Sequence, residues 1–366
     1  MSIKDVINIL EAWAPPALQE SYDNSGLIVG DSGRAFTSSL VCLDCTEEIV
    51  DEAAERGANL IIAHHPIIFR GLKRLTGADY VERTVIKAIK KDVAIYAIHT
   101  NLDNVRQGVN ERIADRIGLS SINRRILLPK SGRLMKLELY VPNHALDDIK
   151  EAIWNAGGGG IGNYDECSFS ISGTGTFRPN EEANPSTGER GQRSTEEEVM
   201  LSVIYPDFLS SSILNAMKAK HPYEEVAYQE IRIENTHQGI GSGLIGSLSE
   251  PMRTSDFIQH LKESMELEVL KHTDLVKEEI EEVALLGGSG VFGLKAAISQ
   301  GADVFITGDV KHHDYFDAEG RIILMDIGHY ESERFTMELI QEYLAGKLPN
   351  FAHLLTEHVT NPVKYA

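Results

Sequence analysis

The chain has 366 residues, of which 42% are hydrophobic and 25% charged, and this length and composition favour two or three soluble globular domains. Its 35 Lys and Arg residues stand against 55 Asp and Glu residues, and a net charge of −20 argues against nucleic-acid binding, which needs a basic surface for phosphate contacts. No segment approaches the roughly 18 apolar residues of a membrane span, and the first residues show no apolar signal segment, so we expect a cytoplasmic protein without a membrane partner.

The three cysteines are too few for a disulfide framework, which also suits a cytoplasmic protein. Cys42 and Cys45 match the C-x-x-C pattern of redox and zinc sites. No second Cys pair accompanies them, and no helix opens on the first Cys, so we expect small buried strand residues instead.

Strand and helix patterns alternate over residues 1–128. Apolar strands are expected at 27–30, 39–44, 60–63 and 93–98, and helices after Ser2, after Thr46, over 79–91 and over 108–117. This alternation predicts βα units on a parallel sheet, the first lobe of an α/β core.

The pattern changes near Pro129, where half-exposed strands replace fully apolar ones. Over residues 129–234 the expected order is β-α-β-β-α-β, which predicts an inserted α+β domain of ferredoxin-like type. Residues 173–198 are rich in Gly, Pro, Glu and Ser, and we expect a long mobile loop there.

The alternation resumes over residues 235–366, the second lobe of the α/β core, so both lobes are expected to carry parallel-rich sheets. Apolar strands are expected near 283–286, 303–307 and 322–327, and a helix over 334–344. The loop Gly287–Gly290 lies between a strand and a helix. Its N–H groups could face an anion, or the glycines could serve tight packing, and the sequence leaves both open.

Titratable side chains gather where these apolar strands end. His64 and His65 follow the strand at 60–63, and the carboxyl ends of strands are where open α/β sheets bind ligands. The other polar side chains in such places are His99, Asn101, Asp103, Asp309, His312, His313, His329 and Glu333. Imidazoles with carboxylates are the ligand set of Zn, Fe, Mn, Co or Ni, so the pattern indicates a metal site.

Adjacent histidines on an extended segment point to opposite sides, so His64 and His65 would bind two different ions. A carboxylate such as Glu333, on the same helical face as His329, could bridge the ions of a dinuclear centre. Each residue also has a structural alternative: His329 and Glu333 as a helix cap, Asp103 as a loop cap, and His312 as a solvent-exposed side chain.

The segments His64–Pro66, His99–Asp103 and Gly328–Glu333, in this order and with an insertion before the last, resemble the GTP cyclohydrolase I type 2 homologue family, also called the Nif-three-like family. The resemblance implies a toroidal homohexamer with metal sites facing an internal cavity. It also implies two divalent ions per subunit, with zinc expected first and Fe, Mn, Co or Ni as alternatives. The implied ligands are His64, His65, Asp103, His329 and Glu333, with Glu333 touching both ions.

The insert around 221–225 resembles the PII-like or CutA-like domain of longer bacterial members. The family name suggests a metal-dependent hydrolase that acts on GTP, or on a related nucleotide or phosphate compound, through metal-activated water. His99 and His312 lie outside the implied ligand set and are candidates for proton transfer or for supporting the ligands. The alternative is a non-enzymatic hexameric scaffold with a regulatory or metal-handling role. An open coordination position would favour the enzyme.

Overall fold

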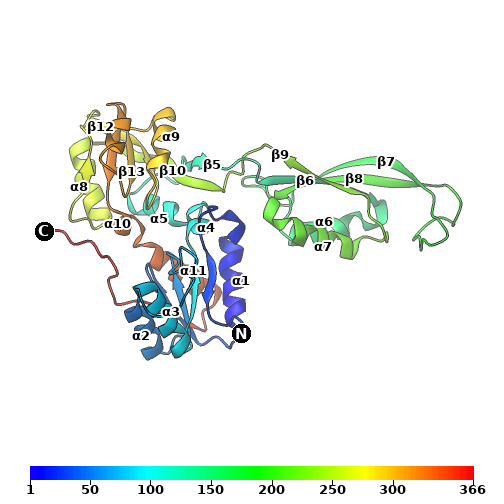
Figure 1. The fold of residues 1–366 in the computed structure, drawn as a ribbon. Coiled ribbons are helices and arrows are strands. Elements are labelled where there is room, and N and C mark those ends of the chain that lie inside the picture. The colour runs from blue at the N-terminus through cyan, green and yellow to red at the C-terminus, as the bar shows by residue number, and fades with distance from the viewer. The chain divides into compact units, whose positions relative to one another are not determined.

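A computed structural model describes all residues, 1–366 (Figure 1). The chain forms two compact units, one made of Met1–Leu128 with Ile240–Ala366 and the other of Pro129–Gly239. The second unit therefore ends at Gly239, whereas the sequence placed the end of the insert at 234. None of the helices combines the length and apolar character needed to cross a bilayer.

The first sheet of the first unit is mainly parallel. Its order is β1 (Gly26–Val29), β4 (Ala94–Ala97), β3 (Leu60–Ala63), β2 (Ser38–Cys42) and β15 (Ala352–Leu355). The strands β4, β3, β2 and β15 run parallel, and only β1 is antiparallel. Every residue of β2, β3 and β4 is buried, which is why β3 and β4 appear in the sequence as unbroken apolar runs and β2 as an apolar run after two serines.

The last strand of this sheet was not expected. β15 comes from the end of the chain, so part of the predicted second lobe completes the sheet of the first. The predicted helix 334–344 is found as α11 (Thr336–Lys347), and a separate short helix, α10 (His329–Glu333), precedes it.

The second sheet contains the other half of the α/β core. Its order is β11 (Lys271–His272), β14 (Ile323–Asp326), β13 (Val304–Thr307), β12 (Glu279–Leu285), β10 (Gly241–Arg253) and β5 (Arg125–Pro129). The strands β12, β13 and β14 are parallel, whereas β10 is antiparallel to β12 and β11 is antiparallel to β14. The predicted α/β fold with parallel-rich sheets is thus confirmed.

Helices cover both sheets and join them. α2 (Glu47–Glu55) and α3 (Tyr80–Lys91) lie side by side over the outer face of the first sheet (Figure 1), and α9 (Leu294–Ser299) covers the second. A single apolar cluster joins the two sheets through α1 (Ile3–Trp13), α5 (Val109–Arg116), α8 (Thr254–Ser264) and α11, and it includes Ile62 and Ile306. Because the two lobes share this core, the strand ends of both are held in fixed positions.

The cysteines of the C-x-x-C pattern are buried, as expected. A hydrogen bond with Cys45 and burial raise the pKa of the Cys42 thiol well above its ordinary range. A thiol held in this protonated form is a poor nucleophile.

The second unit has its own sheet and core. Its antiparallel sheet has the order β7 (Phe169–Phe177), β8 (Ser194–Pro206), β6 (Leu134–Pro142) and β9 (Tyr228–Ile233), packed on α6 (Leu146–Asn155) and α7 (Ser210–Lys220). The observed element order is the expected β-α-β-β-α-β. The loop expected over 173–198 is shorter, because β7 continues to Phe177 and β8 begins at Ser194. The sequence predicts this edge strand only over 167–172, because Gly173 and Gly175 hid its continuation and glycine is unfavourable in strands.

Candidate metal centre

His64 and His65 continue the line of β3 towards a cavity in the first unit. Their N–H groups donate to the carbonyls of Cys42 and Leu43, at 3.1 and 2.9 Å, and so keep the chain paired with the end of β2. The chain bends at these two residues, so the rings do not point to opposite sides as expected, and their centroids lie 5.0 Å apart. The two rings still belong to different groups of side chains around Glu333.

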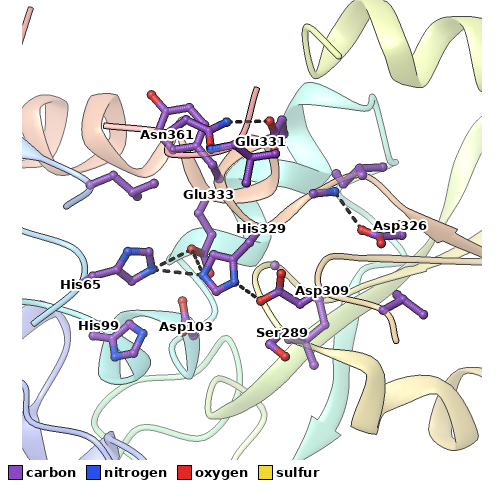
Figure 2. Close-up of a pocket in the computed structure, with 18 of the residues that line it drawn as sticks. His65, His99, Asp103, Ser289, Asp309, Asp326, His329, Glu331, Glu333 and Asn361 are labelled. Carbon is purple, nitrogen blue, oxygen red and sulfur yellow. Dashed lines mark hydrogen bonds and ion pairs between the residues drawn. The ribbon is translucent and has the colours of Figure 1, made fainter. Parts of the chain in front are cut away.

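The first group contains His65, His329 and Glu333, which approach one another in Figure 2. The Nδ1–H of His65 donates to Asp44 Oδ1 at 2.8 Å, and the Nδ1–H of His329 donates to Asp309 Oδ2 at 2.7 Å. The two Nε2 atoms then lie 3.3 Å apart, each 3.0 Å from Glu333 Oε2. Two ring nitrogens and a carboxylate oxygen that meet in this way require a cation between them, either a proton or a metal ion.

The second group contains His64, Asp103 and Glu333. The Nδ1–H of His64 donates to the carbonyl of Ile98 at 2.8 Å, which leaves Nε2 as the free ring nitrogen. This Nε2 lies 3.8 Å from Asp103 Oδ1 and 3.9 Å from Glu333 Oε1. Both His64 Nε2 and Asp103 Oδ1 are buried without a hydrogen-bond partner. Buried polar atoms of this kind are costly unless they coordinate an ion or a water.

Glu333 connects the two groups, because Oε2 belongs to the first and Oε1 to the second. The side chain is only 3% exposed. In each group the potential ligand atoms lie within 4.8 Å of one another. The structure thus brings together all five residues predicted as ligands and arranges them as two groups that could each hold a metal ion.

The glycine-rich loop packs directly against this bridging side chain. The N–H groups of Gly287, Gly288 and Gly290 donate to the side chains of Asn110, Ser332 and Thr307. These donors are therefore engaged within the fold, and of the two interpretations of the loop the structure favours tight packing.

The electrostatics of the cluster favour positive charge. Burial alone would lower the pKa of His65, but its bonds to Asp44 and Glu333 raise it to about 10. Burial alone would also lower the pKa of His329, but Glu333 and Asp309 outweigh this effect and raise the pKa to about 9. Burial and the charge of Glu333 raise the pKa of Asp103 to about 7. Without metal, protons hold the cluster together, and metal ions compete with them for the same atoms.

His99 lies beside the cluster and His312 does not. The ring of His99 is 5.3 Å from those of His64 and His65, and its Nδ1–H donates to Asp23 Oδ1 at 2.7 Å. His99 also forms a third group of potential ligands with His64 and His65. His312 is exposed, packs on His313 and Phe316, and does not line the cavity.

The cavity in front of the cluster has a volume of about 1050 Å³, ample for a nucleotide-sized molecule. Tyr22, Phe69 and Phe292 are exposed rings on its wall. Apart from the histidines of the cluster, its cationic side chains are Lys271, which is paired with Asp326 at 3.0 Å, and Lys311. The remaining charged groups of the wall are mostly carboxylates, so metal ions would supply most of the positive charge available to an anionic substrate.

Two residues that orient the histidines were missed. Asp44 holds His65, and Asp23 holds His99. Asp44 also follows an apolar strand, which was the signal used for the ligands, but its position inside the C-x-x-C pattern drew the interpretation towards the cysteines. Asp23 lies in the polar segment 22–26, which also resembles the family but was given no role.

Comparisons with known proteins agree along the whole chain. The family described as Duf34/NIF3 (NGG1p interacting factor 3) matches residues 1–362. A Halalkalibacterium halodurans protein named GTP cyclohydrolase 1 type 2 homolog is 39% identical over 327 residues, covering 88% of this chain and 87% of its own. A Bacillus subtilis protein of the same name is 34% identical, covering 99% and 98%. The crystal structure of a Bacillus cereus protein related to NIF3 has a TM-score of 0.88 at 34% identity, covering 100% of this chain and 99% of its own.

Proposed function

Because the chain belongs to the Duf34/NIF3 family, as its motifs predicted, we propose that it is a dinuclear divalent-metal protein that hydrolyses a small molecule. GTP, or a related nucleotide or phosphate compound, is the candidate substrate, since relatives are named after this activity. The observation that carries the proposal is the division of the two Glu333 oxygens between two groups of potential ligands.

The number of ligands favours catalysis over a purely structural role. One ion would be held by His65, His329 and Glu333, and the other by His64, Asp103 and Glu333. Three protein ligands per ion leave coordination positions open, as in catalytic zinc sites, whereas structural sites are closed by four. Zinc is the ion we expect first, and Fe, Mn, Co or Ni suit the same donors.

When bound, the two ions would activate a water molecule and polarise the bond under attack. His99 is placed to move a proton nearby, since it lines the same cavity. Asp23 accepts the Nδ1–H of His99 and so leaves Nε2 as the nitrogen that exchanges protons. Burial alone would raise the pKa of Asp23, but hydrogen bonds from His99 and Thr100 outweigh this effect and lower the pKa well below its ordinary range. This carboxylate therefore stays charged while it orients the ring.

The test is turnover of GTP by protein with counted metal ions, with chromatography of the products and the Glu333→Ala variant as the blank. Turnover that follows metal content and disappears in Glu333→Ala supports the hydrolase. Fully metallated protein without turnover removes GTP as the substrate. A failure with a panel of related nucleotides and phosphate compounds as well would favour the non-enzymatic regulatory or metal-handling scaffold.

A further inference from the structure

The chain after β15 runs past the metal centre as an extended segment, residues 356–366, which we name the C-terminal strap. Its start is fixed to the first sheet and to α2. The N–H of Thr356 donates to the carbonyl of Val41 at 3.1 Å, and the N–H of Glu357 donates to Glu52 Oε1 at 3.0 Å. The strap therefore leaves the sheet from a defined point.

Further along, the strap reaches a residue that supports a predicted ligand. The hydroxyl of Thr360 donates to Asp44 Oδ2 at 2.9 Å. The other oxygen of Asp44 accepts the Nδ1–H of His65 at 2.8 Å. Thr360 thus restrains the carboxylate that sets the orientation and tautomer of the His65 ring, and partners of this kind tune metal affinity.

The end of the strap reaches the helix that carries the other ligands of the same group. Asn361 Nδ2 and the Tyr365 hydroxyl both donate to Glu331 Oε1, each at 2.9 Å. Figure 2 shows the bond of Asn361 to Glu331 next to Glu333. Glu331 is 8% exposed and lies in α10 between His329 and Glu333. Its carboxylate also packs on Gly328, where a Cβ would come within 2.1 Å of Oε2, so the space to move away is small.

We propose that the C-terminal strap is a positioning element of the metal centre: Thr360 holds His65 through Asp44, and Asn361 with Tyr365 holds α10 through Glu331. The inference rests on the proposed dinuclear function and names the residues that set its geometry. It assigns the strap a contact to each side of one ligand group, the strand end that carries His65 and the helix that carries His329.

The alternative is that these residues only complete the fold. Core packing does not support that view, because Val359, Val363 and Tyr365 are 71%, 55% and 40% exposed. The strap is held near the site mainly by its polar bonds to Asp44 and Glu331. Removing those bonds should therefore leave the core intact and act on the metal ligands.

The experiment measures Zn²⁺ affinity of the full-length chain by competition with a chelator. Thr360→Val removes the hydroxyl at nearly constant shape, and it should weaken one of the two binding steps by about 10-fold or more. Thr360→Ser retains the donor and should bind as the wild type does. The double variant Asn361→Leu/Tyr365→Phe should weaken both steps, because α10 carries His329 and the bridging Glu333. Val359→Ala, in the same strap but without a polar contact to the site, is the control.

The outcomes distinguish a failure of the proposed strap role from a failure of the proposed function. If the wild type binds two Zn²⁺ ions and the strap variants bind them equally well, the positioning role of the strap is wrong but the proposed metal centre is supported. Equal weakening by Val359→Ala and Thr360→Val also overturns that role, since the effect would then be general. Wild-type protein that binds none of the divalent ions of Zn, Fe, Mn, Co and Ni contradicts both. Thermal unfolding of the metal-free variants confirms that each is folded before it is titrated.

Discussion

Gly288 and Glu333 lie so close together that a Cβ on Gly288 would come within 2.2 Å of Glu333 Oε1. Gly288 also has a φ of +64°, in the left-handed region that favours glycine. The loop between β12 and α9 thus contacts the carboxylate of Glu333 from one side, and the backbone of α10, which contains Glu333, fixes where the side chain begins.

The variant Gly288→Ala should therefore lose metal as well as stability, because the new methyl group displaces Glu333. Gly301→Ala is the matched control: Gly301 has a φ of +81°, but a Cβ there meets nothing within 4 Å. It should cost about 1 kcal/mol from backbone strain alone and leave metal content unchanged. Metal content together with the free energy of unfolding distinguishes the two effects. Equal metal content in both variants would contradict the packing role of the loop.

Substitution of the two histidines predicted as proton-transfer candidates should have different effects on the rate of turnover. His99→Gln should reduce metal-dependent turnover about 100-fold or more, because positioned proton transfer contributes at least that much. His312→Gln should have no effect, since His312 is exposed outside the cavity. Metal content must be counted in both, because His99 also lies near enough to act as a ligand. A His99→Gln variant that keeps its metal and its full rate would exclude the proton-transfer role.

The metal-free protein should lose stability as the pH rises. The pKa values of Asp103, His329 and His65, about 7, about 9 and about 10, all lie above their ordinary values. For each group the folded chain binds the proton more tightly than the unfolded chain, so the stabilisation is present at low pH and is lost as the pH passes the folded pKa.

The midpoint temperature of thermal unfolding in the presence of a chelator should accordingly decrease from about pH 6.5 to about pH 10 because of the two histidines, and Asp103 should add a decrease between about pH 4 and about pH 7. Added Zn²⁺ should reduce the fall, because the ion takes the place of the protons. A midpoint that stays level or rises over this interval would show that the cluster does not hold its protons as described. The lowered pKa of Glu333 acts below its ordinary value of 4.5 and does not affect the range above it.

The family resemblance leads us to propose a homohexamer, and light scattering tests it. The expected mass is six times the 40.5 kDa of one chain. A monomeric mass at micromolar concentration would contradict the proposed ring.

The candidate ligand positions could be predicted because each follows a short apolar strand or begins a helix, and these are local patterns. The choice of five proposed ligands among them came from the family resemblance. His65 and Glu333 lie 268 positions apart, yet the topology of a parallel sheet brings strand ends to one edge. The proposal that Glu333 bridges two ions began from an expected alternation of His64 and His65, which the structure does not show. The two oxygens of Glu333 nevertheless lie in different groups that contain these residues.

What the sequence did not predict depends on contacts between distant segments. β15 pairs with β2 across the length of the chain, and no local pattern signals that register. Asp44 and Thr360 are ordinary polar residues until the fold brings them together, 316 positions apart. The continuation of the edge strand β7 beyond Ser172 was hidden by its glycines, which are unfavourable in strands unless a neighbour supplies the pairing.

The most direct measurement of the central claim is the number of metal ions per chain in the wild type, Glu333→Ala and His65→Ala, with exposed Glu319→Ala as the control. The account predicts two ions in the wild type and in Glu319→Ala, loss of both in Glu333→Ala, and loss of mainly one in His65→Ala. Equal losses in Glu333→Ala and His65→Ala, or a single ion in the wild type, would contradict a centre bridged by Glu333.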